Sequence, residues 1–184
     1  MPPSLDTSTL AVSSSIVTCY HGTSVERAAG IIREQRFIPS RNAEDWLGDG
    51  VYFFQDGLGH AQRWAQKRFG EHATVIEAEV RLGRCLDLLS GLYDGIMQAG
   101  YAGLEAQHTA AGTQPPVNTV RGRNERDCAI MRLIVAAATD PIQTIRCSFP
   151  EGDPLYPGAA IGQLDHTQLC VLDQACIQTL TWLR

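Results

Sequence analysis

Apolar residues in this chain of 184 residues occur in short blocks separated by loops that contain glycine and proline. Residues 51–54 form a fully apolar segment of strand length, whereas residues 124–138 carry apolar side chains at helical spacing. No stretch approaches the roughly 20 apolar residues needed to cross a bilayer. Short strands mixed with helices, without a regular alternation of strand and helix, predict an α+β fold.

The same patterns place the remaining elements along the chain. Further strands are expected over 16–20, 75–80, 142–149 and 169–172, and further helices over 25–35, 60–69 and 91–100. Residues 102–123 contain glycine and proline with little periodicity, which indicates irregular structure. Residues 1–15 are rich in Ser, Thr and Pro, which is typical of a flexible tail rather than a signal peptide. We therefore expect one domain, residues 16–184.

Charge and cysteine content narrow the functional classes. The net charge of −5 argues against a broad basic surface for duplex nucleic acid. None of the six cysteines forms a C-x₂-C pair, so we expect no metal site. Several cysteines have apolar neighbours, which favours buried, reduced thiols and a cytoplasmic protein, although an even count leaves disulfides open.

Two short motifs carry most of the functional information. His21-Gly22-Thr23 follows the first expected strand, and Gly48-Asp49-Gly50-Val51-Tyr52 leads into the second. With the helix between them and the Phe-Ile-Pro-Ser segment before residue 41, this order is similar to the donor site of ADP-ribosyltransferases of the poly(ADP-ribose) polymerase-like (His-Tyr-Glu) class. The resemblance covers residues 18–65 clearly and the last strand more loosely.

The resemblance implies a fold, a co-substrate and a role for several residues. It implies two antiparallel sheets that form a cleft for NAD⁺, with no metal. His21 would bind a ribose hydroxyl, Gly22 would present its backbone to the nicotinamide amide, and Tyr52 would stack on the pyridinium ring. The other expected donor-site residues are Thr23, Ser40, Arg41, Gly50, His60 and Trp64. From the residues alone, His21 could instead be structural, and Tyr52 and Trp64 could belong to the core.

The class closes its site with a glutamate on a late strand, and here Gln168 occupies that position. An amide can bind a hydroxyl but supplies neither negative charge nor a base. Three interpretations follow: Gln168 orients the ribose while Glu151 or Asp165 supplies the charge, the glutamine is an introduced substitution, or the domain binds NAD⁺ without turning it over. We favour the first, with His21, Tyr52, Gln168 and Glu151 as the catalytic set, although Glu151 could equally be a solvated turn residue.

The activity implied by the resemblance is mono-ADP-ribosylation of a macromolecule. The acceptor would be protein, RNA or DNA, and the basic run 121–126 could steer a nucleic acid or simply begin a helix. The small size is typical of a bacterial or phage toxin with an antitoxin or immunity protein as partner, acting in the cytoplasm, its own or that of a target cell, and not on a membrane. The alternatives are an inactive NAD⁺- or ADP-ribose-binding module and an NAD⁺-dependent RNA 2′-phosphotransferase.

Overall fold

A computed structural model describes residues 7–119 and 123–183. Its strands are β1 (Val12–Ser24), β2 (Val51–Gln55), β3 (Ala73–Asp87), β4 (Thr144–Phe149), β5 (His166–Val171) and β6 (Ile177–Leu183). Its α-helices are α1 (Val25–Glu34), α2 (Leu58–Phe69), α3 (Asp94–Ala111) and α4 (Glu125–Ala137), and single 3₁₀ turns lie at Gly70–His72 and Gln174–Cys176. No helix within these residues is long and apolar enough to span a membrane.

The strands form one closed barrel and not two separate sheets. The order β1-β2-β5-β4-β3 is completed by pairing of β3 with β1, and β6 adds to the other edge of β3. The pairing of β3 with β4 is parallel, whereas the other pairs are antiparallel. The prediction of two antiparallel sheets flanking a cleft is therefore wrong. Its cause is physical: β1 and β3 are long enough to pair with each other while also reaching β2 and β4, and this closes the ring.

The barrel interior is apolar over most of its length and polar at one end. Phe53, Leu169 and Val80 are all at most 1% exposed and belong to one buried cluster. At the other end, Arg146 of β4 donates to Asp87 of β3 at 2.6 Å, with both side chains largely buried. This ion pair spans the parallel strands, where no tight hairpin fixes the register.

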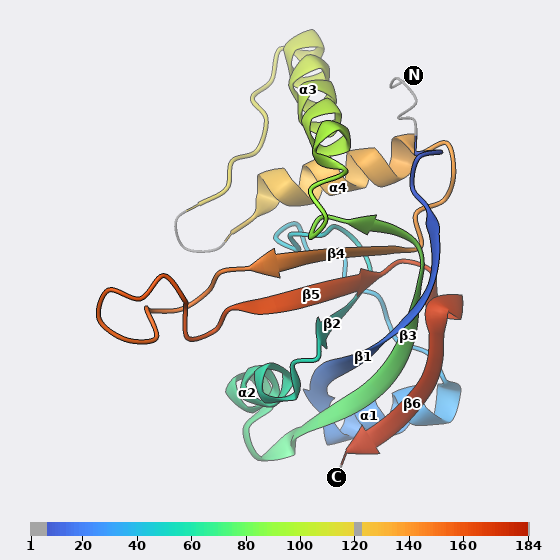
Figure 1. The fold of residues 1–184 in the computed structure, drawn as a ribbon, viewed down its shortest axis with the longest axis vertical. Coiled ribbons are helices and arrows are strands. Elements are labelled where there is room, and N and C mark those ends of the chain that lie inside the picture. The colour runs from blue at the N-terminus through green and yellow to red at the C-terminus, as the bar shows by residue number, and fades with distance from the viewer. Residues whose placement is uncertain (1–6, 120–122, 184) are drawn as a thin grey trace.

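The helices cover opposite parts of the barrel (Figure 1). α3 and α4 pack together beside β4 and β5, whereas at the far end α1 lies near β1, β3 and β6, and α2 lies near β1, β2 and β3. A second apolar cluster, which includes Leu104, Ile134 and Ile145, fills the space between α3, α4 and β4. Gly100 of α3 allows close packing, because a Cβ there would lie 2.7 Å from the side chain of Ile134.

Several element boundaries differ from the sequence prediction. α3 continues to Ala111, so the expected irregular segment is helical over about half its length. Its alanines favour helix, and contact with α4 offsets the cost of its glycines. β6 was not predicted. At the amino end, Leu10 is fully buried and β1 starts at Val12, within the expected tail, whereas residues 1–6 of that tail lie outside the described residues.

Candidate functional site

The site lies where β1 and β2 separate. Their antiparallel ladder has two rungs, Cys19 with Gln55 and Tyr20 with Phe54. By register the next hydrogen-bonded pair would be Gly22 with Tyr52, but among the described residues the ladder ends before it. A cleft of about 640 Å³ opens at this point, between β1, β2 and the segment 36–50.

His21 fills part of the gap between the two strands. Its Nδ1 lies 2.8 Å from the carbonyl oxygen of Tyr52, and a carbonyl only accepts, so Nδ1 carries the hydrogen. Burial lowers the pKa of His21, although this hydrogen bond opposes the shift. The ring makes edge contacts with Phe37 and Phe53. A neutral imidazole held in this tautomer presents Nε2 as a hydrogen-bond acceptor.

Gly22 is buried and lines the cleft through its backbone. The carbonyl of Thr18 accepts from the N–H of Asp56, so the backbone groups of Thr18 point toward β2. Every second residue of a strand turns its N–H and C=O to the same side, so those of Gly22 also point toward β2. A side chain is excluded here for a second reason: a Cβ on Gly22 would overlap the carbonyl oxygen of Ala61 in α2. Glycine thus serves both the packing of α2 and the open edge.

Tyr52 anchors the loop over the cleft through its hydroxyl. The hydroxyl donates to the carbonyl of Gly48 at 2.7 Å and accepts from the N–H of Leu47 at 3.0 Å. Burial raises the pKa of this phenol far above its ordinary value, so it stays protonated. Because the hydroxyl is occupied, the ring is what Tyr52 offers to a ligand.

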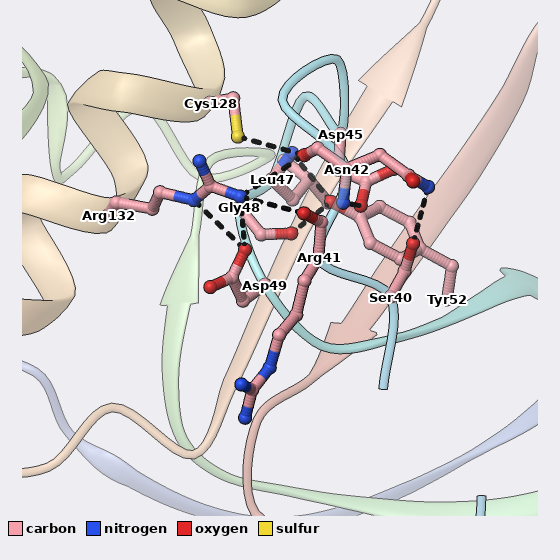
Figure 2. Close-up of polar contacts among 10 residues, drawn as sticks. All are labelled: Ser40, Arg41, Asn42, Asp45, Leu47, Gly48, Asp49, Tyr52, Cys128 and Arg132. Carbon is pink, nitrogen blue, oxygen red and sulfur yellow. Dashed lines mark hydrogen bonds and ion pairs between the residues drawn. The ribbon is translucent and has the colours of Figure 1, made fainter. Parts of the chain in front are cut away.

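The same loop is tied to α4 (Figure 2). Arg132 donates to Asp49 Oδ1 at 2.7 and 2.9 Å and to the carbonyls of Arg41 and Asn42 at 3.2 Å each. The guanidinium of Arg41 extends away from this network (Figure 2) and does not line the cleft. Ser40 does line it, and its backbone pairs with Gly50 in an isolated bridge. The loop is therefore held in place before any ligand binds.

Gln168 lies on the strand next to β2 and lines the cleft. It is 9% exposed. Its Nε2 lies 2.9 Å from Nε2 of His166, and its Oε1 is buried and accepts no hydrogen bond from any described residue. A buried carbonyl oxygen without a donor is costly, so this atom indicates a polar group supplied by a ligand or by water.

The remaining predicted residues divide between the cleft and its surroundings. The residues Thr23, Gly50 and Trp64 line the cleft, and Trp64 is 43% exposed rather than part of the core. His60 lies outside the lining residues: its ring stacks on Phe54 with centroids 5.9 Å apart.

The two acidic candidates from the loop before β5 do not line the cleft either. Glu151 Oε2 lies 3.6 Å from Nδ1 of His166 and the side chain is half exposed. Asp165 accepts from the backbone N–H groups of Glu151 and Gly162, and these hydrogen bonds lower its pKa. Neither carboxylate is thus placed against the cleft as the sequence interpretation required.

Sequence reasoning missed the basic side chains of the cleft. Arg27, Arg36 and Arg68 line it, with Arg27 over the ring of Phe69 and Arg68 over Trp64. Arg27 and Arg68 come from helices with ordinary charged faces, so no local motif marks them. Of the predicted basic run, Arg121 lies outside the described residues, and Arg123 is paired with Glu44 and Glu125.

No family model matches this sequence. Over 70 residues the chain is 34% identical to Uncharacterized protein MJ0359 of Methanocaldococcus jannaschii, covering 35% of this chain and 32% of that protein. The chain thus matches about a third of the length of this curated relative. The crystal structure of an anti-CRISPR protein aligns with a TM-score of 0.42 and 12% identity over 94% of this chain and 98% of that one. Neither similarity assigns the chain to a family.

Proposed function

We propose that the cleft binds NAD⁺ and that the protein transfers its ADP-ribose to a macromolecular acceptor. The observation that carries the proposal is the buried, unpartnered amide oxygen of Gln168 in the same cleft as His21. Two hydrogen-bond acceptors in one cleft match the adjacent hydroxyls of a ribose, which can donate one proton to each.

The nicotinamide end fits the seam between β1 and β2. One edge of a primary carboxamide presents an N–H donor beside a C=O acceptor in one plane, and the N–H and C=O of Gly22 are complementary to that edge. Tyr52 lines the same cleft, and pyridinium is a cation that an aromatic face attracts. The ladder stops one rung early, and this leaves the Gly22 edge for the carboxamide.

The ribose end requires charge complementarity in the transition state. Loss of neutral nicotinamide from NAD⁺ leaves positive charge on the ribose, and groups aimed at that charge accelerate the step. The Gln168 oxygen carries only a partial negative charge, so we expect slow transfer of single ADP-ribose units rather than polymer synthesis. Arg27, Arg36 and Arg68 give the cleft a basic side suited to the pyrophosphate.

Titration calorimetry with NAD⁺, run beside a nicotinamide-release assay, tests the proposal. We expect the wild type to bind NAD⁺ and to release nicotinamide slowly. We expect Gln168→Met to lower the rate of release about tenfold or more, since removing one transition-state hydrogen bond costs at least that much. The matched control is Gln163→Met, because Gln163 lies in an exposed loop and its side-chain amide donates to the carbonyl of Pro154. Absence of both binding and release at millimolar NAD⁺ would overturn the proposal.

Two further outcomes would replace the transferase assignment. Binding without release, in extracts that contain protein and nucleic acid acceptors, would identify a binding module. Turnover only with RNA that carries a 2′-phosphate would identify a phosphotransferase. Labelled NAD⁺ followed by protease or nuclease digestion identifies the acceptor when transfer occurs.

A further inference from the structure

The side chain of His166 lies behind Gln168, two residues away on the same face of β5. It is 3% exposed. Its Nδ1 lies 2.6 Å from the carbonyl oxygen of Leu164, and that oxygen can only accept, so the hydrogen of the neutral ring is on Nδ1. Nε2 of the ring is left with a lone pair and accepts a hydrogen bond.

This tautomer fixes the orientation of the neighbouring amide. The Gln168 atom that faces Nε2 of His166 at 2.9 Å must be a donor, so it is the NH₂ group, and the carbonyl oxygen is turned the other way. We propose that His166 is a positioning residue that sets the Gln168 amide with its oxygen toward the cleft, so that the negative end of the dipole faces the ligand.

The proposal rests on the proposed function for its chemical consequence. A ribose hydroxyl can bind either end of an amide, so reversing Gln168 would change affinity for NAD⁺ only slightly. Positive charge that develops on the ribose favours the oxygen and is disfavoured by NH₂. By orienting the amide, His166 allows a neutral glutamine to stabilise part of the positive charge that a carboxylate would otherwise stabilise.

Packing holds the His166 ring in place. Phe54, Phe149 and Trp46 surround it with ring centroids 5.1, 6.0 and 6.5 Å away. These contacts come from β2, β4 and the loop before β2, so the orientation of the ring does not depend on β5 alone.

The ionisable groups that face this ring come from two elements. His60 of α2 lies 5.3 Å away, centroid to centroid, and is bonded to Arg63, whereas Glu151 and Asp165 belong to the loop before β5. A hydrogen on Nε2 of His166 in place of Nδ1 would require Gln168 to turn its oxygen to the ring and its NH₂ to the cleft.

Nuclear magnetic resonance of the unliganded full-length protein tests the orientation directly. Long-range ¹H–¹⁵N correlation spectra of the His166 ring should show hydrogen on Nδ1 and a bare Nε2. A neutral ring with its hydrogen on Nε2 would overturn the proposal. The spectra need no activity, so they decide the orientation even when NAD⁺ is not turned over.

Kinetics of nicotinamide release test the consequence. We expect His166→Phe to lower kcat by about ten- to a hundredfold with little change in KM. Phe149→Leu is the control for packing, since it loosens the ring cluster but leaves both hydrogen bonds of His166 in place, and it should retain most of the activity.

The decisive comparison is a double-mutant cycle with Gln168→Glu. The two oxygens of a carboxylate are equivalent and need no orientation, so the loss caused by His166→Phe should largely disappear in that background. An equal loss in both backgrounds would mean that His166 acts only structurally and would overturn the positioning role. Absence of turnover in the wild type, together with the expected spectra, would count against the proposed function and not against the amide orientation.

Discussion

The two edges of β1 differ sharply in how they are used. Along one edge β1 pairs with β3 over eleven positions from Val12 to Ser24, whereas along the other it pairs with β2 at only two. The strand is therefore paired along most of one side and open on the other, at Gly22. The continuous seams thus stabilise the barrel, whereas the interrupted seam leaves backbone hydrogen-bonding groups for a ligand.

The largest expected effect is at the β3–β4 seam, away from the interrupted β1–β2 seam. Asp87→Ala removes the partner of Arg146, whose Nε already lacks a hydrogen-bond partner among the described residues, and leaves a charge largely buried. We expect the free energy of unfolding to fall by about 3 kcal/mol or more, measured by urea denaturation, while the folded protein binds NAD⁺ as before.

Asp140→Ala is the matched control for that change. Asp140 pairs with Arg84 at 3.8 Å and is 44% exposed, so its loss should cost less than about 1 kcal/mol. Equal losses for the two variants would show that the β3–β4 seam has no special share in stability.

A smaller effect is expected at the interrupted seam. Gly22→Ala places a methyl group against the carbonyl of Ala61 and should cost about 1–3 kcal/mol. Displacement of α2 would also distort the open edge, so we expect NAD⁺ affinity to fall about tenfold, or 1.4 kcal/mol, in calorimetry. Gly95→Ala is the control, because nothing lies within 4 Å of the added methyl group and helix propensity favours alanine. Unchanged affinity in folded Gly22→Ala would refute the role of the open edge.

The smallest effect is a dependence of stability on pH. Burial lowers the pKa of His21 below its ordinary value of 6.5, so the unfolded chain takes up a proton at a higher pH than the folded protein does. The stability linked to His21 is complete above that ordinary value and is lost as the pH falls from there toward the lowered pKa. One pH unit below the ordinary value the loss is at most about 1.4 kcal/mol.

Urea denaturation between pH 7.5 and 5.5, for the wild type and for His21→Asn, measures the part of the unfolding free energy that is linked to His21. The variant should lose less stability on acidification than the wild type, whereas His72→Asn, at an exposed position, should follow the wild type. Parallel pH profiles for His21→Asn and the wild type would contradict the proposed environment of the ring.

Sequence predicted local structure better than long-range pairing. α1, α2 and α4 follow from apolar spacing, and Ser24 caps α1 through a hydrogen bond to the N–H of Arg27. Closure of the barrel could not be foreseen, because it depends on contacts between β1 and β3 that no local pattern encodes. α3 was truncated in the prediction because its glycines, which allow close contact with α4, resemble loop residues when seen alone.

In the candidate site, too, local motifs were predicted better than long-range contacts. His21, Gly22, Tyr52 and Gln168 were picked out from short motifs, and all line one cleft. The hydroxyl of Tyr52 is occupied by the loop, which sequence could not show. His166 could have been noticed, since residues two apart on a strand share a face and an imidazole next to an amide is a natural hydrogen-bonding pair.

The link between Arg132 and the loop over the cleft has a kinetic consequence. A cover fastened to a helix at several points cannot swing aside as a lid, so a ligand must approach through an opening that already exists. Exchange of NAD⁺ should then occur without a slow conformational step, and association and dissociation should each follow a single exponential. Severing the fastening, as in Arg132→Gln, should add a slower second phase rather than speed the first.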